Sequence, residues 1–229
     1  LLDEAEHLFV RDPLPDVHPV TALKARIWIT QGKLNKVMSW THERGLSIDD
    51  NLSYLREFEH ITLARTLIAQ YMKDRIDAAI HEALGLLKRL LQEAEEGNRT
   101  GSKIEILTLQ AIAYNAQDDL DSALVALECA LILAEPEGYV RIFVDEGIPM
   151  AELLKEAAKH GIAPNYINLL QRAFRKTKVG AAITQQLIEP LSEREMEVLK
   201  LLRTELSGPE IASHMIISIN TLRTHTKNI

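Results

Sequence analysis

The side chains best suited to chemistry lie near the end of the sequence, between residues 219 and 229. Four polar residues recur there at helical spacing and would share one face of a helix: Asn220, Arg223, Thr224 and Lys227. The opposite face would be more apolar, with Ile219, Leu222, Thr226 and Ile229. Such polar groups can reach the base edges and phosphates of double-stranded DNA, and no acidic residue occurs between 211 and 229. Taken alone, the same stripe would equally suit a solvated helix surface.

Three short helices are predicted to position these residues. Two begin with a capping box, Ser192 with Glu195 and Ser207 with Glu210, and Ser218 can cap the third, with Thr221 at its third helical position. An apolar pair flanks each cap at the spacing of a hydrophobic staple: Leu191 and Met196, Leu206 and Ile211, Ile217 and Leu222. The last two helices therefore form a candidate helix-turn-helix.

Residues 191–229 resemble the LuxR-type helix-turn-helix. The resemblance rests on Leu-Ser-x-Arg-Glu-x-Glu-Val-Leu at 191–199, Leu-Ser-x-x-Glu-Ile-Ala at 206–212 and Ile-Ser-x-Asn-Thr-Leu-Arg-Thr-His-x-Lys-Asn-Ile at 217–229. It implies base contacts from Arg223, Thr224 and Lys227, and backbone contacts from Asn220, Thr221 and His225. It also implies a small core that contains Leu199, Ile211, Leu222 and Ile229.

The segment departs from the family pattern in three ways. Glu205 stands where the family has a glycine, and a left-handed backbone there would cost roughly 1 kcal/mol. Gly208-Pro209 replaces a polar pair, although proline is tolerated in the first turn of a helix. The family's recognition helix also continues past Ile229 and precedes a fourth helix, often used for dimerisation. We therefore read the chain as a fragment, and the resemblance implies a possible homo-oligomer in the full-length protein.

The composition is that of an ordinary globular protein. The 229 residues include 46% hydrophobic and 26% charged residues, and a net charge of −7 excludes a wholly basic nucleic-acid binder. The single Cys129 excludes an internal disulfide and fits a reducing, cytoplasmic compartment, and we expect a buried, inert thiol. No apolar run approaches the roughly 18 residues of a membrane span, so no membrane partner is expected.

The body of the chain reads as helices in pairs. Helical periodicity covers about 18–31, 34–45, 52–71, 75–95, 101–116, 120–135, 149–160 and 165–176. Ala25, Ala64 and Ala111 recur on the first helix of each pair, which lets neighbouring axes approach closely. Pairs that stack in this way form a helical solenoid, and the pattern resembles tetratricopeptide repeats. We therefore predict an all-α protein: a tetratricopeptide-like helical-repeat superhelix followed by a small helix-turn-helix domain.

Three segments follow from this reading: a repeat domain over 1–176, a linker over 177–190 and the helix-turn-helix domain over 191–229. Residues 138–144 could form a strand or a short buried helix, and the all-helical context favours the helix. The run from Glu135 to Gly147 resembles the large ATP-dependent LuxR-type regulators of the MalT-like group. That resemblance implies an ATPase module ahead of the repeats, an effector or partner signal received by the repeats, and promoter binding by the C-terminal module.

No catalytic or cofactor motif is found, so neither an enzyme nor a cofactor is predicted for this fragment. Gly97 to Lys103 lacks the spacing of a phosphate loop and is better explained as a helix end followed by a helix start. His42 and His81 lack a second histidine at metal-ligand spacing and are expected at the surface. Asp118, Asp119 and Asp121 are expected to cap a helix rather than bind metal.

Two other functions remain open for the repeats. The solenoid could be a protein-interaction scaffold without DNA binding, or its groove could bind a small molecule. Trp28, Trp40 and Tyr114 are candidates to line such a groove, although aromatic residues on repeat helices more often belong to the core. The sequence does not identify the small-molecule effector or protein partner.

Overall fold

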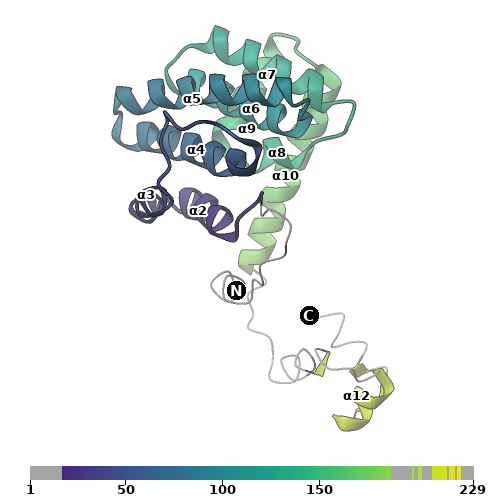
Figure 1. Cartoon of the computed structure of the whole chain (residues 1–229). Helices are drawn as coiled ribbons and strands as arrows, with labels where there is room; N and C mark the ends of the chain where they lie inside the picture. Colours follow the sequence, from purple (N-terminus) through teal and green to yellow (C-terminus); the bar gives the residue numbers. More distant parts are fainter. Residues whose placement is uncertain are drawn as a thin grey trace. The chain divides into compact units, whose positions relative to one another are not determined.

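The computed structural model describes residues 17–186, 198, 201–202, 208–215, 217–219 and 221–222, with residues 176–186 described as backbone helix only. Every regular element among these residues is helical, as predicted (Figure 1). The chain divides into two compact units, Leu1–Phe174 and Arg175–Ile229. No helix in the described part of the chain is both long and apolar enough to cross a membrane.

Three helix pairs, each joined by a tight turn, build the first unit. The pairs are α2 (Val20–Thr30) with α3 (Leu34–Glu43), α4 (Glu57–Asp74) with α5 (Asp77–Glu96), and α6 (Thr100–Ala116) with α7 (Leu120–Ala134). A short 3₁₀ turn, η1 (Tyr54–Arg56), leads into α4. Each pair packs on the next, because α4 contacts α2 and α3 while α6 contacts α4 and α5. This stacking confirms the tetratricopeptide-like repeat.

Small residues let the helices approach, as the sequence predicts. Ala25, Ala64 and Ala111, whose recurrence indicates the repeat, are each fully buried. Leucine and isoleucine side chains fill the layers between the pairs, and burying each stabilises the fold by about 1.5–3 kcal/mol. The largest fully buried ones are Ile80, Leu86, Leu87, Leu90, Ile104, Ile106, Leu127 and Leu131.

The turns between helices lie where the sequence predicts them. The turns after α4, α5 and α6 place Arg75, Asn98 and Asp118 in the left-handed region, with φ of 53°, 51° and 63°. Asparagine and aspartate tolerate this conformation better than other non-glycine residues. Asp119 then caps α7 by accepting a hydrogen bond from the Ser122 backbone N–H at 3.1 Å, which confirms capping at this turn.

After α7 the chain forms α8 (Arg141–Val144) and α9 (Ile148–Lys159). The ambiguous run 138–144 is therefore partly a short helix, and its Phe143 is fully buried. Gly147, with φ of 71°, turns the chain sharply into α9.

His42 and His81 are exposed, as the sequence predicts. Cys129 was predicted to be buried, and this prediction is wrong because its side chain is exposed. Cys129 lies on the side of α7 that faces away from Ala126, Leu127 and Ala130 in the core.

The helix α10 (Pro164–Gln186) continues past the helix end that the sequence predicts near residue 176. Residues 177–186 of the predicted linker are therefore helical. Gly180 alone opposes helix by about 1 kcal/mol relative to alanine, and no proline occurs between Pro164 and Pro190 to stop it. The proposed domain boundaries at 176 and 191 stay predictions.

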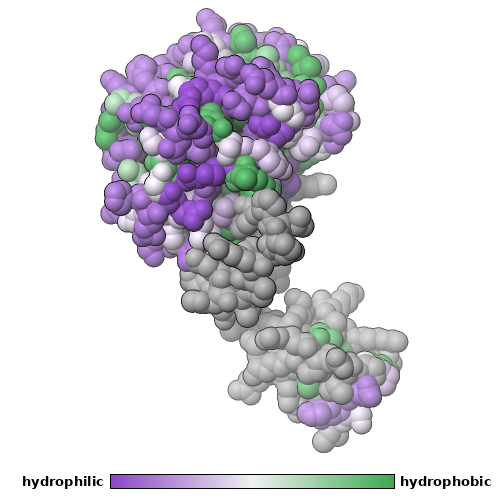
Figure 2. Space-filling view, viewed as in Figure 1, coloured by the Kyte–Doolittle hydropathy of each residue, from purple (hydrophilic) through white to green (hydrophobic). Residues whose placement is uncertain are grey.

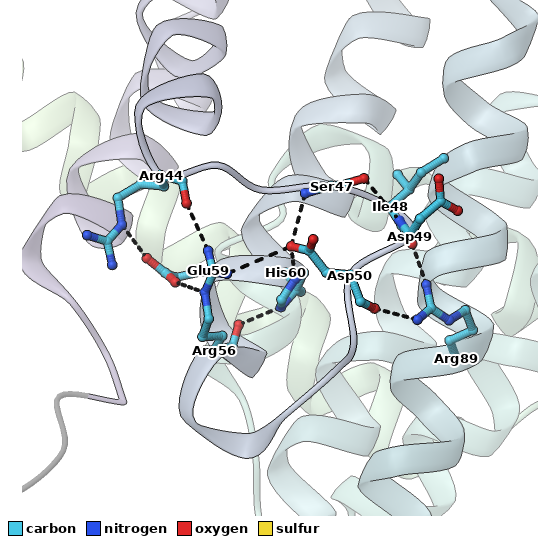
Figure 3. A network of polar contacts seen from close by, with 9 residues as sticks. All are labelled: Arg44, Ser47, Ile48, Asp49, Asp50, Arg56, Glu59, His60 and Arg89. Atoms are coloured by element: carbon cyan, nitrogen blue, oxygen red, sulfur yellow. Dashed lines mark hydrogen bonds and ion pairs between the residues drawn. The ribbon is translucent and has the colours of Figure 1, made fainter.

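A polar clasp fastens the loop at 44–53 between the first and second helix pairs (Figure 3). The buried carboxylate of Glu59 accepts from Arg44 Nε at 2.7 Å and from Arg56 Nε at 3.0 Å. Arg56 also donates to the Arg44 carbonyl at 3.0 Å. From α5, Arg89 donates to the carbonyls of Ile48 and Asp50. The loop is therefore held to α4 and α5 by its backbone as well as its side chains.

A buried histidine lies at the centre of this clasp. His60 Nδ1 lies 3.0 Å from the Arg56 carbonyl oxygen, and Nε2 lies 3.0 Å from Asp50 Oδ2. His60 lies in α4 and Asp50 in the loop, so the ring ties the loop to the helix. The hydrogen bond from His60, followed by that from the Ser47 N–H, holds the pKa of Asp50 below its usual value. His60 is thus a structural link that periodicity alone does not distinguish from a surface histidine.

Candidate functional site

Four charged side chains meet on one side of the repeat unit. Arg26 comes from α2, Arg65 from α4, Glu105 from α6 and Glu146 from the turn before α9. Glu105 Oε1 accepts from Arg26 Nη1 at 2.7 Å and from Arg65 Nη2 at 2.8 Å. Arg65 Nη1 donates to Glu146 Oε2 at 2.8 Å. We call these four residues the groove network; it joins three helices and the α8–α9 corner.

Burial and opposite charge set the electrostatics of the groove network. Burial alone would lower the pKa of Arg65, but Glu146 and Glu105 outweigh it and hold that pKa above its ordinary value. Burial would likewise raise the pKa of Glu105, and Arg65 and Arg26 keep it low instead. For Arg26, burial dominates and lowers the pKa to about 10, although Glu105 opposes the shift. Arg26, Arg65 and Glu105 therefore remain charged at neutral pH.

Arg26 also has neutral partners. Its Nε donates to Thr62 Oγ1 at 2.9 Å, and its guanidinium carbon lies 3.6 Å from the centre of the Phe58 ring. Stacking on an aromatic face fixes the plane of the guanidinium. The groove network is thus preformed, and its donors and acceptors are held at fixed positions.

A cavity of about 480 Å³ opens beside the groove network. Arg26, Arg65, Glu105 and Glu146 line it on one side. Aliphatic side chains supply much of the remaining wall, namely Ile27, Ile68, Met72, Leu109, Ile112 and Ile142. Mainly apolar walls with a few fixed polar groups are typical of small-molecule sites, and this volume falls within their usual range.

A second hollow of about 390 Å³ shares Glu105 and Ile142 with the first. On its wall, Glu57 accepts from Arg99 Nε at 3.0 Å and from Ser102 Oγ at 2.8 Å. The two hollows therefore adjoin along the inner helices of the repeats.

The aromatic residues predicted as possible lining lie elsewhere. Trp40 is buried with Ala22, Ala25 and Val37 in a core cluster, and Trp28 packs against the same cluster. Tyr114 packs against the main core. None of the three lines either hollow, so the alternative that such aromatics belong to the core is confirmed.

Sequence reasoning missed the groove network, although the sequence holds a signal for it. Arg26 and Arg65 each directly follow a buried repeat alanine, Ala25 and Ala64, and so occupy equivalent positions in two repeats. Glu105 lies between two apolar residues in the third repeat. A charged residue at the same place in successive repeats indicates a line of charge along one face of the solenoid.

In the second unit, residues from three segments form a small hydrophobic cluster. Val198, Ile211, Ala212, Met215 and Leu222 are buried together, with Leu201 and Ile217 packed against them. The first segment contributes Val198 and Leu201, the second is the helix α12 (Gly208–His214) with Met215, and the third contributes Ile217 and Leu222. Ile211 and Leu222 were predicted as core and are confirmed; Leu199 and Ile229 lie outside the described residues.

The predicted turn chemistry of this unit is confirmed where the structure describes it. The Thr221 N–H donates to Ser218 Oγ at 3.1 Å, so Ser218 caps the third predicted helix. Pro209 lies in the first turn of α12, where proline is tolerated. Ser192, Ser207 and Glu205, which carry the other predictions about caps and turns, lie outside the described residues.

Of the six predicted DNA-contacting residues, the structure describes Thr221 alone, and places it at the Ser218 cap. The others lie outside the described residues: Asn220, Arg223, Thr224, His225 and Lys227. Among the described residues, no three His, Cys, Asp or Glu side chains gather as a possible metal site.

Comparison with known proteins identifies both units. A family model described as the MalT-like TPR region matches residues 1–160, more than half of the chain. A model described as bacterial regulatory proteins, luxR family, matches residues 189–229. The chain belongs to the MalT-like group of the LuxR-type family.

Similar curated proteins of this MalT-like group carry the name HTH-type transcriptional regulator MalT. That of Serratia proteamaculans (strain 568) is 22% identical, over 89% of this chain and 25% of its own length. That of Vibrio campbellii (strain ATCC BAA-1116) is 24% identical, over 88% and 24% respectively. The chain therefore spans about a quarter of the length of these relatives. No solved structure is similar enough to count as a match.

Proposed function

We propose that this chain is part of a DNA-binding transcriptional regulator, in which residues 191–229 bind promoter DNA. The observation that carries the proposal is the small cluster of Val198, Ile211, Ala212, Met215 and Leu222. It joins the three segments in which the sequence predicts a helix-turn-helix, and residues 189–229 match the luxR family. Relatives named as transcriptional regulators support the same function.

In this proposal Arg223, Thr224 and Lys227 contact bases, and Asn220, Thr221 and His225 contact the backbone. The capped turn at Ser218 supports this proposal, because it lies where the sequence predicts the start of the recognition helix. Arginine and lysine can donate to the two major-groove acceptors of guanine, and threonine can touch a thymine methyl group.

Lys227→Ala is expected to weaken binding to duplex DNA by about 1–3 kcal/mol if Lys227 reads a base, or to reduce the salt slope by about one if it contacts phosphate. The measurement is fluorescence anisotropy of a labelled duplex across a salt titration. Lys155→Ala, an exposed lysine on α9, is the matched control. Binding curves of Lys227→Ala that match the unsubstituted protein at every salt concentration would contradict the assignment.

We propose further that the groove beside the groove network receives the effector or protein partner of the repeat domain. Its preformed polar groups and aliphatic walls favour a ligand with both polar and apolar parts. A protein-interaction scaffold without DNA binding remains the competing function. The DNA titration separates the two, because a scaffold predicts no salt-dependent binding to the duplex.

Ala69→Trp is expected to fill much of the cavity, because Ala69 lines it from α4. Compounds that raise the melting temperature of the unsubstituted protein through this cavity should lose that effect in the variant, since a ligand stabilises a protein only in proportion to its binding. The measurement is a thermal-shift screen of small molecules, counter-screened with Ala69→Trp. The control is Ala78→Trp, at an exposed position on α5. Equal shifts in both variants would place the ligand elsewhere.

A further inference from the structure

The exposed face of α7 carries acidic and aliphatic side chains in alternation. Five exposed residues follow one another at steps of three and four: Asp121, Val125, Glu128, Ile132 and Glu135. At 3.6 residues per turn, all five fall within about 40° of one line along the helix. We call this row the α7 seam.

The aliphatic members of the seam are unusually open to solvent. Val125 is 63% exposed and Ile132 is 61% exposed, while Ala123, Leu127 and Ala130 on the other side of α7 are fully buried. On the face seen in Figure 2, hydrophobic patches are small and separated by hydrophilic surface. A single exposed aliphatic residue is ordinary, but two that repeat at coiled-coil spacing make a strip on which another helix can pack.

The charged members of the seam have no local counter-charge. The sequence holds no lysine, arginine or histidine from Ile104 to Val140. Asp121, Glu128 and Glu135 form no ion pair within the described part of the chain. The strip is therefore anionic throughout, and its carboxylates are available to cations from outside.

We propose that the α7 seam docks a cationic amphipathic helix of a partner protein, in which lysine or arginine alternates with aliphatic residues at steps of three and four. The aliphatic residues of that helix would pack between Val125 and Ile132 along the ridges of α7. Its cations would pair with the three carboxylates. An acidic helix is excluded by like-charge repulsion, and an uncharged apolar helix would desolvate the carboxylates without pairing them.

The probe is a synthetic peptide with leucine and lysine alternating at steps of three and four, and a second peptide with glutamate in place of lysine. Binding is measured by fluorescence anisotropy of the labelled peptides. We expect the lysine peptide to bind and the glutamate peptide not to bind. Cys129 flanks the seam and is the single thiol of the chain. The rate of alkylation of Cys129 should therefore fall in proportion to the fraction of the protein that has peptide bound.

Matched variants separate a docking site from general attraction to an acidic protein. Glu128→Lys should weaken binding roughly tenfold or more, whereas Glu82→Lys on α5, with the same change in net charge, should change it less than about twofold. Ile132→Ser should likewise weaken binding more than Ile148→Ser, because both side chains are exposed but Ile132 alone belongs to the seam. Equal effects within either pair, or no binding, would overturn the proposal. If protection of Cys129 grows with protein concentration in the absence of peptide, the seam packs against a second copy of the chain. That result would also overturn the proposal.

Discussion

Arg65→Ala is expected to lower the free energy of unfolding by about 3–5 kcal/mol, as for other charges left unpaired by the loss of a buried partner. Arg65 supplies the ion pair of Glu146, at 2.6 Å, and one of the two ion pairs of Glu105. Glu146 is 10% exposed and would lose its one ion pair among the described residues. For a protein of this size, the melting temperature should fall by roughly 6–20 °C.

Arg141→Ala is the matched control for this prediction. Arg141 pairs with Asp145 at 2.8 Å, but the two side chains are 77% and 53% exposed. A solvated pair of this kind contributes about 0–1 kcal/mol. Urea unfolding followed by circular dichroism measures both variants. Equal losses of unfolding free energy in Arg65→Ala and Arg141→Ala would mean that the buried ion pairs of the groove network stabilise the fold no more than a solvent-exposed pair does.

The fold could be predicted largely from sequence, because its signals are local. Gly32, Asn98 and Asp118 are residues of types that often end a helix, and helices end at all three. The recurring buried alanines indicate that the helices pack in pairs. The exceptions have equally local causes. Gly180 and the polar residues near it suggest a helix end near residue 176, but one glycine costs too little to end α10 there. Cys129 was expected in the core because cysteine is often buried, yet its place on α7 faces solvent.

The candidate groove could not be predicted in the same way, because its contacts are remote in sequence. Arg26 and Glu105 are 79 residues apart, and Arg65 and Glu146 are 81 residues apart. Periodicity places each residue on a helix face, but it does not give the order in which the pairs stack. The helix-turn-helix was easier to predict, because its predicted caps and core lie within 38 residues of sequence, from Ser192 to Ile229. Its base-contacting residues remain predictions.

Ile211→Ala is expected to abolish DNA binding by unfolding the C-terminal unit while the repeat unit stays folded. Ile211 is 1% exposed in a cluster with only four other buried residues among those described. Truncating a buried isoleucine to alanine costs about 2–5 kcal/mol, and a core of this size rarely supplies more than about 3–5 kcal/mol in total. Apparent affinity falls with the folded fraction, so the dissociation constant for duplex DNA should rise by at least about tenfold.

The matched control is Ile219→Ala in the same unit. Ile219 is 37% exposed, so its truncation removes less buried surface and should destabilise the unit less than Ile211→Ala does. Proteolysis within residues 191–229 should speed up in Ile211→Ala alone, and the main helical melting transition should keep its midpoint in both variants. This pattern follows from the two compact units, since the core of the repeats contains no residue of the small cluster. If Ile211→Ala instead lowered the main transition, folding of the two units would be coupled. If it left DNA binding unchanged, the small cluster would not be the core that supports the recognition helix.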